Sequence, residues 1–121
     1  MKESVLKFKS YHFALRIVSL YKYLVNEKKE FILSKQVLRS GTAIGALIRE
    51  AAFGESKLDF ISKMSIALKE ASETDYWLDI LKDTQYLTQK EFVNMKTECC
   101  ELLKLLTATI KTAKQKVIKT A

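Results

Sequence analysis

The chain has 121 residues and a formal net charge of +7, with 48% hydrophobic and 29% charged residues. This length predicts one domain spanning residues 1–121, and the ordinary apolar content excludes wholesale disorder. No apolar run approaches the roughly 18 residues that a membrane span requires, and the charged start lacks the apolar block of a signal peptide. We therefore expect a cytoplasmic protein that makes no membrane contact.

The composition favours long helices joined by short connections. There is no proline, and glycine occurs only three times. Apolar residues recur every three or four positions, which is the period of an α-helix. The pattern predicts four helices, at about 4–25, 34–53, 56–85 and 88–117. Because short connections make consecutive helices antiparallel, the expected fold is all-α, an antiparallel up-down-up-down four-helix bundle.

Capping residues support these boundaries. Ser34 is the predicted N-cap of the second helix, and Gly54 is placed to follow its end. Ser56 opens the third helix, with Asp59 three positions later. The clearest start is that of the fourth helix, where Thr88 and Glu91 have the spacing of a capping box.

Two glycines lie inside the second predicted helix, at positions 41 and 45. Glycine in a helix interior costs about 1 kcal/mol relative to alanine, so the pair needs a structural reason. A neighbouring segment that approaches the helix closely is the usual one. We expect such a close contact at Gly41 and Gly45.

The central stretch resembles a known family, the four-helix-bundle proteins encoded in intervening sequences of bacterial 23S rRNA genes, which share their fold with accessory proteins of diversity-generating retroelements. The likeness runs from about residue 8 to residue 106. It is sharpest in Arg39-Ser40-Gly41-Thr42, Ile44-Gly45-Ala46, Arg49-Glu50-Ala51, Asp59-Phe60, Ala67-Leu68-Lys69-Glu70-Ala71, Glu73-Thr74 and Tyr76-Trp77-Leu78. One departure is Leu47, where the family commonly has asparagine.

The resemblance implies an antiparallel bundle assembled as a homopentameric ring, without enzymatic activity. It also implies nucleic-acid binding through basic surfaces and, in the retroelement branch, a reverse transcriptase as partner.

The residues themselves indicate no catalytic chemistry. His12 is the only histidine, and the adjacent Cys99 and Cys100 supply too few ligands for a zinc site. The Glu-x-x-His units of di-iron bundles are missing, and the glycine spacing fits no phosphate-binding loop. We expect a protein that is not an enzyme and uses no metal or cofactor, with the cysteines reduced and at least one of them in the core.

Charged residues of the central helices admit two interpretations. Arg39 and Arg49 are ten positions apart, so they lie near one another around the second helix. They could contact phosphates, or they could form partly buried ion pairs or subunit contacts together with Glu50, Glu70 and Glu73. The structural interpretation is the one that we favour.

Positive charge is concentrated at the two ends of the sequence. Residues 1–25 contain five basic residues and one acidic residue, and residues 103–121 contain five lysines and no acidic residue. The bundle topology brings both segments to the same end, which predicts phosphate binding there. No aromatic residue is interleaved with the lysines of the fourth helix, which favours binding by charge alone. The predicted contacts are Lys7, Arg16, Lys104, Lys111, Lys114, Lys116 and Lys119.

Self-association is expected from the third helix. Ile66, Trp77 and Ile80 lie off its core-facing side, and an exposed apolar patch of this kind usually marks an interface. The sequence thus supports two functions. One is a nucleic-acid-binding accessory protein for RNA or DNA. The other is an oligomeric scaffold or protein-interaction module whose positive charge serves solubility or a protein partner.

Overall fold

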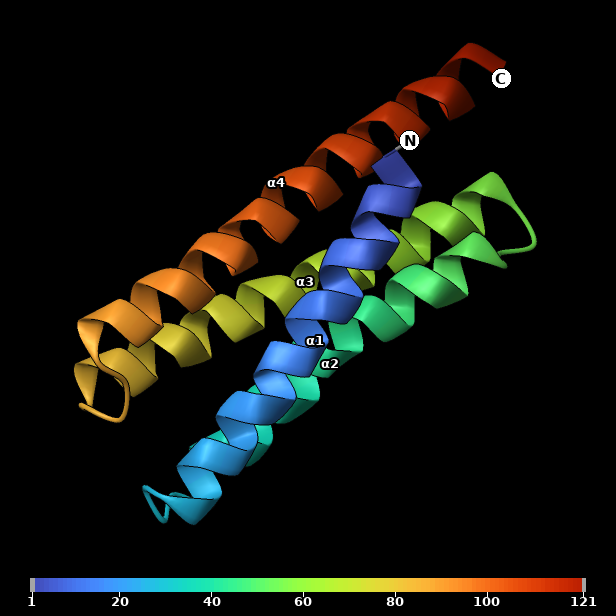
Figure 1. Cartoon of the computed structure of the whole chain (residues 1–121). Helices are drawn as coiled ribbons and strands as arrows, with labels where there is room; N and C mark the ends of the chain where they lie inside the picture. The colour runs from blue at the N-terminus through green and yellow to red at the C-terminus, as the bar shows by residue number, and fades with distance from the viewer. Residues whose placement is uncertain (1, 121) are drawn as a thin grey trace.

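A computed structural model describes residues 2–120 of the chain, with side chains from Val5 to Lys119. The described residues form four α-helices: α1 (Lys2–Asn26), α2 (Leu33–Ala52), α3 (Lys57–Asp83) and α4 (Gln89–Thr120). Consecutive helices run antiparallel (Figure 1). The predicted all-α up-down-up-down bundle is confirmed.

Each helix contacts two others, in the order α1–α2–α3–α4 and back to α1. The start of α1, the α2–α3 connection and the end of α4 lie at one end of the bundle, and the other two connections lie at the opposite end (Figure 1). Helix α4 has 32 residues and continues past the start of α1. We call the end that holds both termini the terminal end.

The core is built from the helical periodicity of the sequence. Its largest fully buried side chains come from all four helices, because each helix turns one apolar stripe inward. They are Leu6, Phe13, Ile17, Leu24, Val37, Ile44, Ile48, Met64, Leu78, Leu81, Leu102 and Leu106.

The close approach predicted at the two glycines is confirmed at Gly41 and is looser at Gly45. Helix α1 lies against α2 there, and Ile17 occupies the space beside Gly41: a Cβ atom on Gly41 would lie 2.7 Å from Ile17 Cγ1. At Gly45 the nearest atoms belong to Ser10, and the same Cβ would lie 3.4 Å from its carbonyl oxygen. Gly41 is therefore required for the contact between α1 and α2, whereas Gly45 leaves room for a methyl group.

Two of the predicted caps are present. Ser56 accepts a hydrogen bond from the backbone N–H of Asp59 at 3.0 Å. At the start of α4, Glu91 accepts from the N–H of Thr88 at 2.9 Å, and Thr88 accepts from the N–H of Glu91 at 3.2 Å. This reciprocal pair is a complete capping box.

The predicted cap at Ser34 is wrong. Helix α2 begins one residue earlier, at Leu33, so Ser34 lies within its first turn, with a fully buried hydroxyl. Instead, the carboxylate of Glu30 accepts from the N–H groups of Ile32, Leu33 and Ser34 at 3.1, 2.9 and 2.6 Å. Glu30 lies three residues before the first residue of α2, and its carboxylate thus accepts hydrogen bonds from N–H groups that have no partner within the helix.

Candidate functional site

Arg39 joins α2 to α3 through two acidic residues. Its guanidinium donates to both carboxylate oxygens of Glu70, at 2.9 and 3.2 Å, and to Glu73. The Trp77 indole N–H also donates to Glu73, at 3.0 Å. These hydrogen bonds, first from Trp77 and then from Arg39, lower the pKa of Glu73. With two acids on one guanidinium, this cluster leaves no positive charge for a phosphate.

A buried polar contact next to this cluster joins the same two helices. Thr74 Oγ1 is 2.9 Å from Ser40 Oγ and 2.8 Å from the carbonyl oxygen of Glu70, and both hydroxyl residues are fully buried. Paired hydroxyls in an apolar core have few alternative partners, so they fix the register of α2 against α3. We therefore assign the family-like residues Arg39, Ser40, Glu70, Glu73 and Thr74 to the α2–α3 contact.

Arg49 and Glu50, near the end of α2, do not join this cluster. The Arg49 guanidinium lies 5.2 Å from the centre of the Tyr11 ring on α1, and Glu50 is 3.6 Å from Lys63 Nζ on α3. Arg49 makes no ion pair with a described carboxylate. Within the chain, Glu70 and Glu73 therefore pair with Arg39 and not with Arg49, whose side chain points toward α1.

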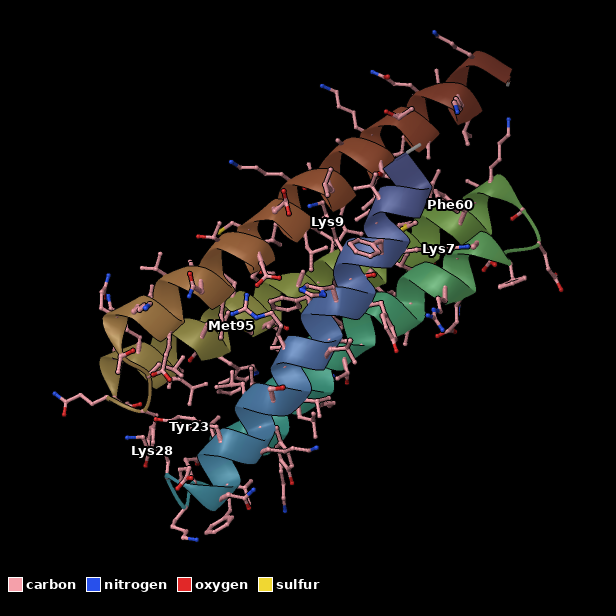
Figure 2. All side chains as sticks on the ribbon, in the orientation of Figure 1. Lys7, Lys9, Tyr23, Lys28, Phe60 and Met95 are labelled. Carbon is pink, nitrogen blue, oxygen red and sulfur yellow. The ribbon has the colours of Figure 1, made fainter. Side chains whose placement is uncertain are left out.

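Ion pairs also connect α1 to α4. Arg16 pairs with Glu98, and Lys9 Nζ lies 2.9 Å from Glu101 Oε1. Figure 2 shows Lys9 on the side of α1 that faces α4, and Lys7 on the side away from it. Among the predicted phosphate contacts, Arg16 is thus already held by an acid, whereas Lys7 is exposed.

The remaining predicted contacts lie along the second half of α4. Lys104, Lys111, Lys114 and Lys119 are exposed and make no ion pair with a described carboxylate, and Lys116 is also exposed. The last turns of α4, which contain Lys114, Lys116 and Lys119, continue past the start of α1 at the terminal end (Figure 1). By contrast, Lys9, Lys63 and Lys96 pair with acids on a neighbouring helix.

The three predicted interface residues of α3 differ in exposure. Ile66 is exposed, with 41% of its surface accessible, whereas Trp77 and Ile80 are half-buried. Tyr76 is also exposed and meets Trp77 edge to face, with ring centres 5.1 Å apart. Trp77 thus donates a hydrogen bond within the Arg39 cluster and also packs against the exposed Tyr76 on α3.

The buried thiol of Cys99 agrees with the core role expected for a cysteine. Its sulfur lies 3.4 Å from the carbonyl oxygen of Ala71, and burial raises its pKa to about 12. A thiol with such a pKa carries almost no thiolate at neutral pH, so it is a poor nucleophile. Among the residues that the structure describes, no group of three His, Cys, Asp or Glu side chains could hold a metal ion.

The sequence interpretation missed an apolar face on α1. Phe8, Tyr11 and Leu15 are 72%, 51% and 50% exposed, on the side opposite to the buried Leu6 and Phe13. Their spacing of three and four residues indicates a second apolar face on the helix. The sequence interpretation did not use it, because the core-facing stripe alone was enough to predict a helix there.

These features define a small basic four-helix bundle in which partly exposed ion pairs and buried hydroxyls hold helices together. No helix in the described part of the chain is long and apolar enough to cross a membrane. The 23S rRNA-intervening sequence protein family matches residues 2–108, and the chain belongs to this family.

One solved structure is similar over most of its length. It is a protein of unknown function from the S23 ribosomal protein family of Bacteroides thetaiotaomicron, 56% identical to this chain. The similarity covers 92% of this chain and 99% of that one, with a TM-score of 0.91. No curated protein matches.

Proposed function

We propose that this chain is a non-enzymatic accessory protein that binds nucleic acid through the phosphates. The supporting observation is the set of four exposed lysines on α4, Lys104, Lys111, Lys114 and Lys119, which make no ion pair with a described carboxylate. Cations without a protein partner can neutralise phosphates and release counterions, which is the main source of affinity in non-specific nucleic-acid binding. The matched family and the similar structure carry names that refer to ribosomal RNA genes and to a ribosomal protein family.

Neutralising three of these lysines tests the proposal. In the variant Lys104→Gln/Lys111→Gln/Lys114→Gln, we expect weaker binding to RNA and DNA of every sequence. Each lost phosphate contact lowers the slope of log affinity against log salt by about one unit, so the slope falls by about three. Fluorescence anisotropy across a salt series measures both quantities.

A charge-matched control separates position from net charge. Lys35, Lys69 and Lys90 are exposed lysines on three helices and make no ion pair with a described carboxylate. Changing these three to glutamine removes the same charge, and we expect it to leave the salt slope close to that of the wild type. Equal losses in the two triple variants would mean that net charge, and not the position of the α4 lysines, drives binding. No wild-type binding at low salt would support the scaffold function instead.

We also propose that the protein works as a homo-oligomer that uses the outer face of α3, with five copies as the number that the resemblance implies. The supporting observation is the exposure of Ile66 and Tyr76 beside the half-buried Trp77 and Ile80. The resemblance to the retroelement accessory proteins also predicts a reverse transcriptase as a protein partner.

Light scattering at micromolar concentration tests self-association. We expect the wild type at a multiple of 13.9 kDa and the variant Ile66→Glu at or near the monomer mass, because a charge in an apolar interface is costly. Val93→Glu is the control, since Val93 has a similar exposure, 45%, on α4. A wild type that stays at 13.9 kDa refutes the oligomer.

A further inference from the structure

The exposed face of α1 differs from the set of exposed lysines on α4 because it carries aromatic rings. Phe8 is 72% exposed and Tyr11 is 51% exposed, one turn apart. Neither ring belongs to the core or to the Arg39 cluster. A face of exposed rings is unusual for a protein surface and marks a binding surface.

Both rings are held in place by neighbours. The Arg49 guanidinium of α2 lies 5.2 Å from the centre of the Tyr11 ring, a cation–π contact. Phe8 stacks on His12, with ring centres 6.2 Å apart and planes 8° apart. Because the rings are already ordered, a ligand that stacks on them loses less conformational entropy on binding.

Two cations, Lys7 and Arg49, lie beside these rings. Lys7 and Arg49 are exposed and make no ion pair with a described carboxylate. The ion pair between Lys9 and Glu101 places that part of α4 beside α1, so Lys104, one turn further along α4, lies near the level of Phe8. At the end of α2, Phe53 is 85% exposed one turn beyond Arg49. Glu50, Glu55 and Asp59 line the same pocket as Arg49 and Phe53, so the unbalanced positive charge of this surface lies on the side of Lys7.

We propose that this surface, formed by Lys7, Phe8, Tyr11, Arg49, Phe53 and Lys104, binds single-stranded nucleic acid. Unpaired bases would stack on Phe8 and Tyr11, and the cations would contact the backbone phosphates. A duplex hides its base faces within the stack, so only a single strand or a loop offers them to a protein ring. This inference rests on the proposed nucleic-acid binding and specifies its substrate.

A second copy of the chain is the alternative occupant of the apolar α1 face. Charge argues against it on the α1 side, because each copy would bring Lys7 to the contact, and Lys7 makes no ion pair with a described carboxylate. The acids Glu50, Glu55 and Asp59 line the pocket beside Arg49 and Phe53, not the α1 side. A polyanion balances this charge. The surface therefore favours nucleic acid over self-association.

The experiment compares a 12-nucleotide single strand with the duplex of the same sequence, by anisotropy at low salt. We expect the wild type to bind the single strand more tightly. In Phe8→Leu and Tyr11→Leu, which keep apolar side chains but remove the rings, affinity for the single strand falls about tenfold for each ring. Affinity for the duplex stays within about twofold, because the cations remain.

Leu15→Ala is the matched control, since Leu15 lies on the same face with the same exposure as Tyr11 but has no ring to stack. We expect wild-type binding from it. Equal wild-type affinity for the two nucleic acids, or equal losses for both in the ring variants, overturns the single-strand inference and leaves phosphate binding standing. A lower mass of the ring variants in light scattering also overturns it, because the face would then be a subunit contact. If neither nucleic acid binds, the proposed function itself fails.

Discussion

Replacing Glu30 by glutamine is expected to lower the free energy of unfolding at neutral pH by about 2 kcal/mol. The Glu30 carboxylate is buried and accepts from three backbone N–H groups at the start of α2. Hydrogen bonds to a charged acceptor contribute about 1.5–3 kcal/mol, and glutamine keeps an acceptor oxygen but no charge. Urea unfolding followed by circular dichroism measures the change.

The same variant predicts a pH dependence. Burial opposes ionisation of Glu30, but the N–H groups of Leu33, Ser34 and Ile32 outweigh it and hold its pKa below the ordinary value of 4.5. A group whose pKa is lowered by folding contributes stability above its unfolded pKa and loses that contribution as the pH falls through the folded pKa. The difference between wild type and Glu30→Gln should therefore be full at pH 7 and shrink below about pH 4.5.

Glu27→Gln is the control for both measurements. Glu27 is an exposed acid three residues earlier, and no hydrogen bond or ion pair of its side chain occurs among the described residues. We expect a change within about 0.5 kcal/mol, as for most surface substitutions. A Glu30→Gln difference that stays constant down to pH 2 would refute the role of the carboxylate charge.

Alanine at the two glycines of α2 is expected to change stability in opposite directions. In Gly41→Ala, the new methyl group would lie 2.7–2.9 Å from three atoms of Ile17, so the α1–α2 contact must shift. Overpacking of this kind typically costs about 1–3 kcal/mol, which exceeds the roughly 1 kcal/mol gained in helix propensity. In Gly45→Ala, the nearest atoms are 3.4 Å away, so the propensity gain should dominate.

Thermal unfolding of the two variants tests this pair. Each substitution adds the same methyl group to the same helix, so their difference isolates the contact with α1. The double variant Gly41→Ala/Ile17→Val removes a methyl group from the crowded side chain, and we expect partial recovery of the melting temperature. Equal destabilisation at positions 41 and 45 would mean that both are packed equally tightly against α1.

Much of the fold was predictable because it depends on local rules. The apolar periodicity places Phe13, Ile44 and Leu102 in the core, and the capping residues Ser56 and Thr88 mark helix starts. Glu30 was missed because its carboxylate caps from outside the helix, across a connection whose backbone path no local signal specifies. Its role depends on how the chain turns between α1 and α2, where Lys29 has a positive φ of 54°.

The candidate site was only partly predictable. Charge counts identify the basic ends of the chain, but they do not tell Arg16, which is paired with Glu98, from the exposed Lys7. In the same way, the sequence lists Arg49 beside Glu50 without showing that one contacts Tyr11 on α1 and the other Lys63 on α3. Each of these side chains finds its partner through the direction in which it points from its own helix toward a neighbouring one.

By itself, the sequence determined the helical class, the bundle order and the positive charge of both chain ends, because periodicity, capping and composition are properties of short segments. Only the tertiary structure decided which cations remain unpaired and which rings gather near them. Phe8 and Phe53 are 45 residues apart in the sequence, and they reach the same end because α1 and α2 pack antiparallel. Contacts between distant segments depend on how helices pack, and packing is a property of the whole chain.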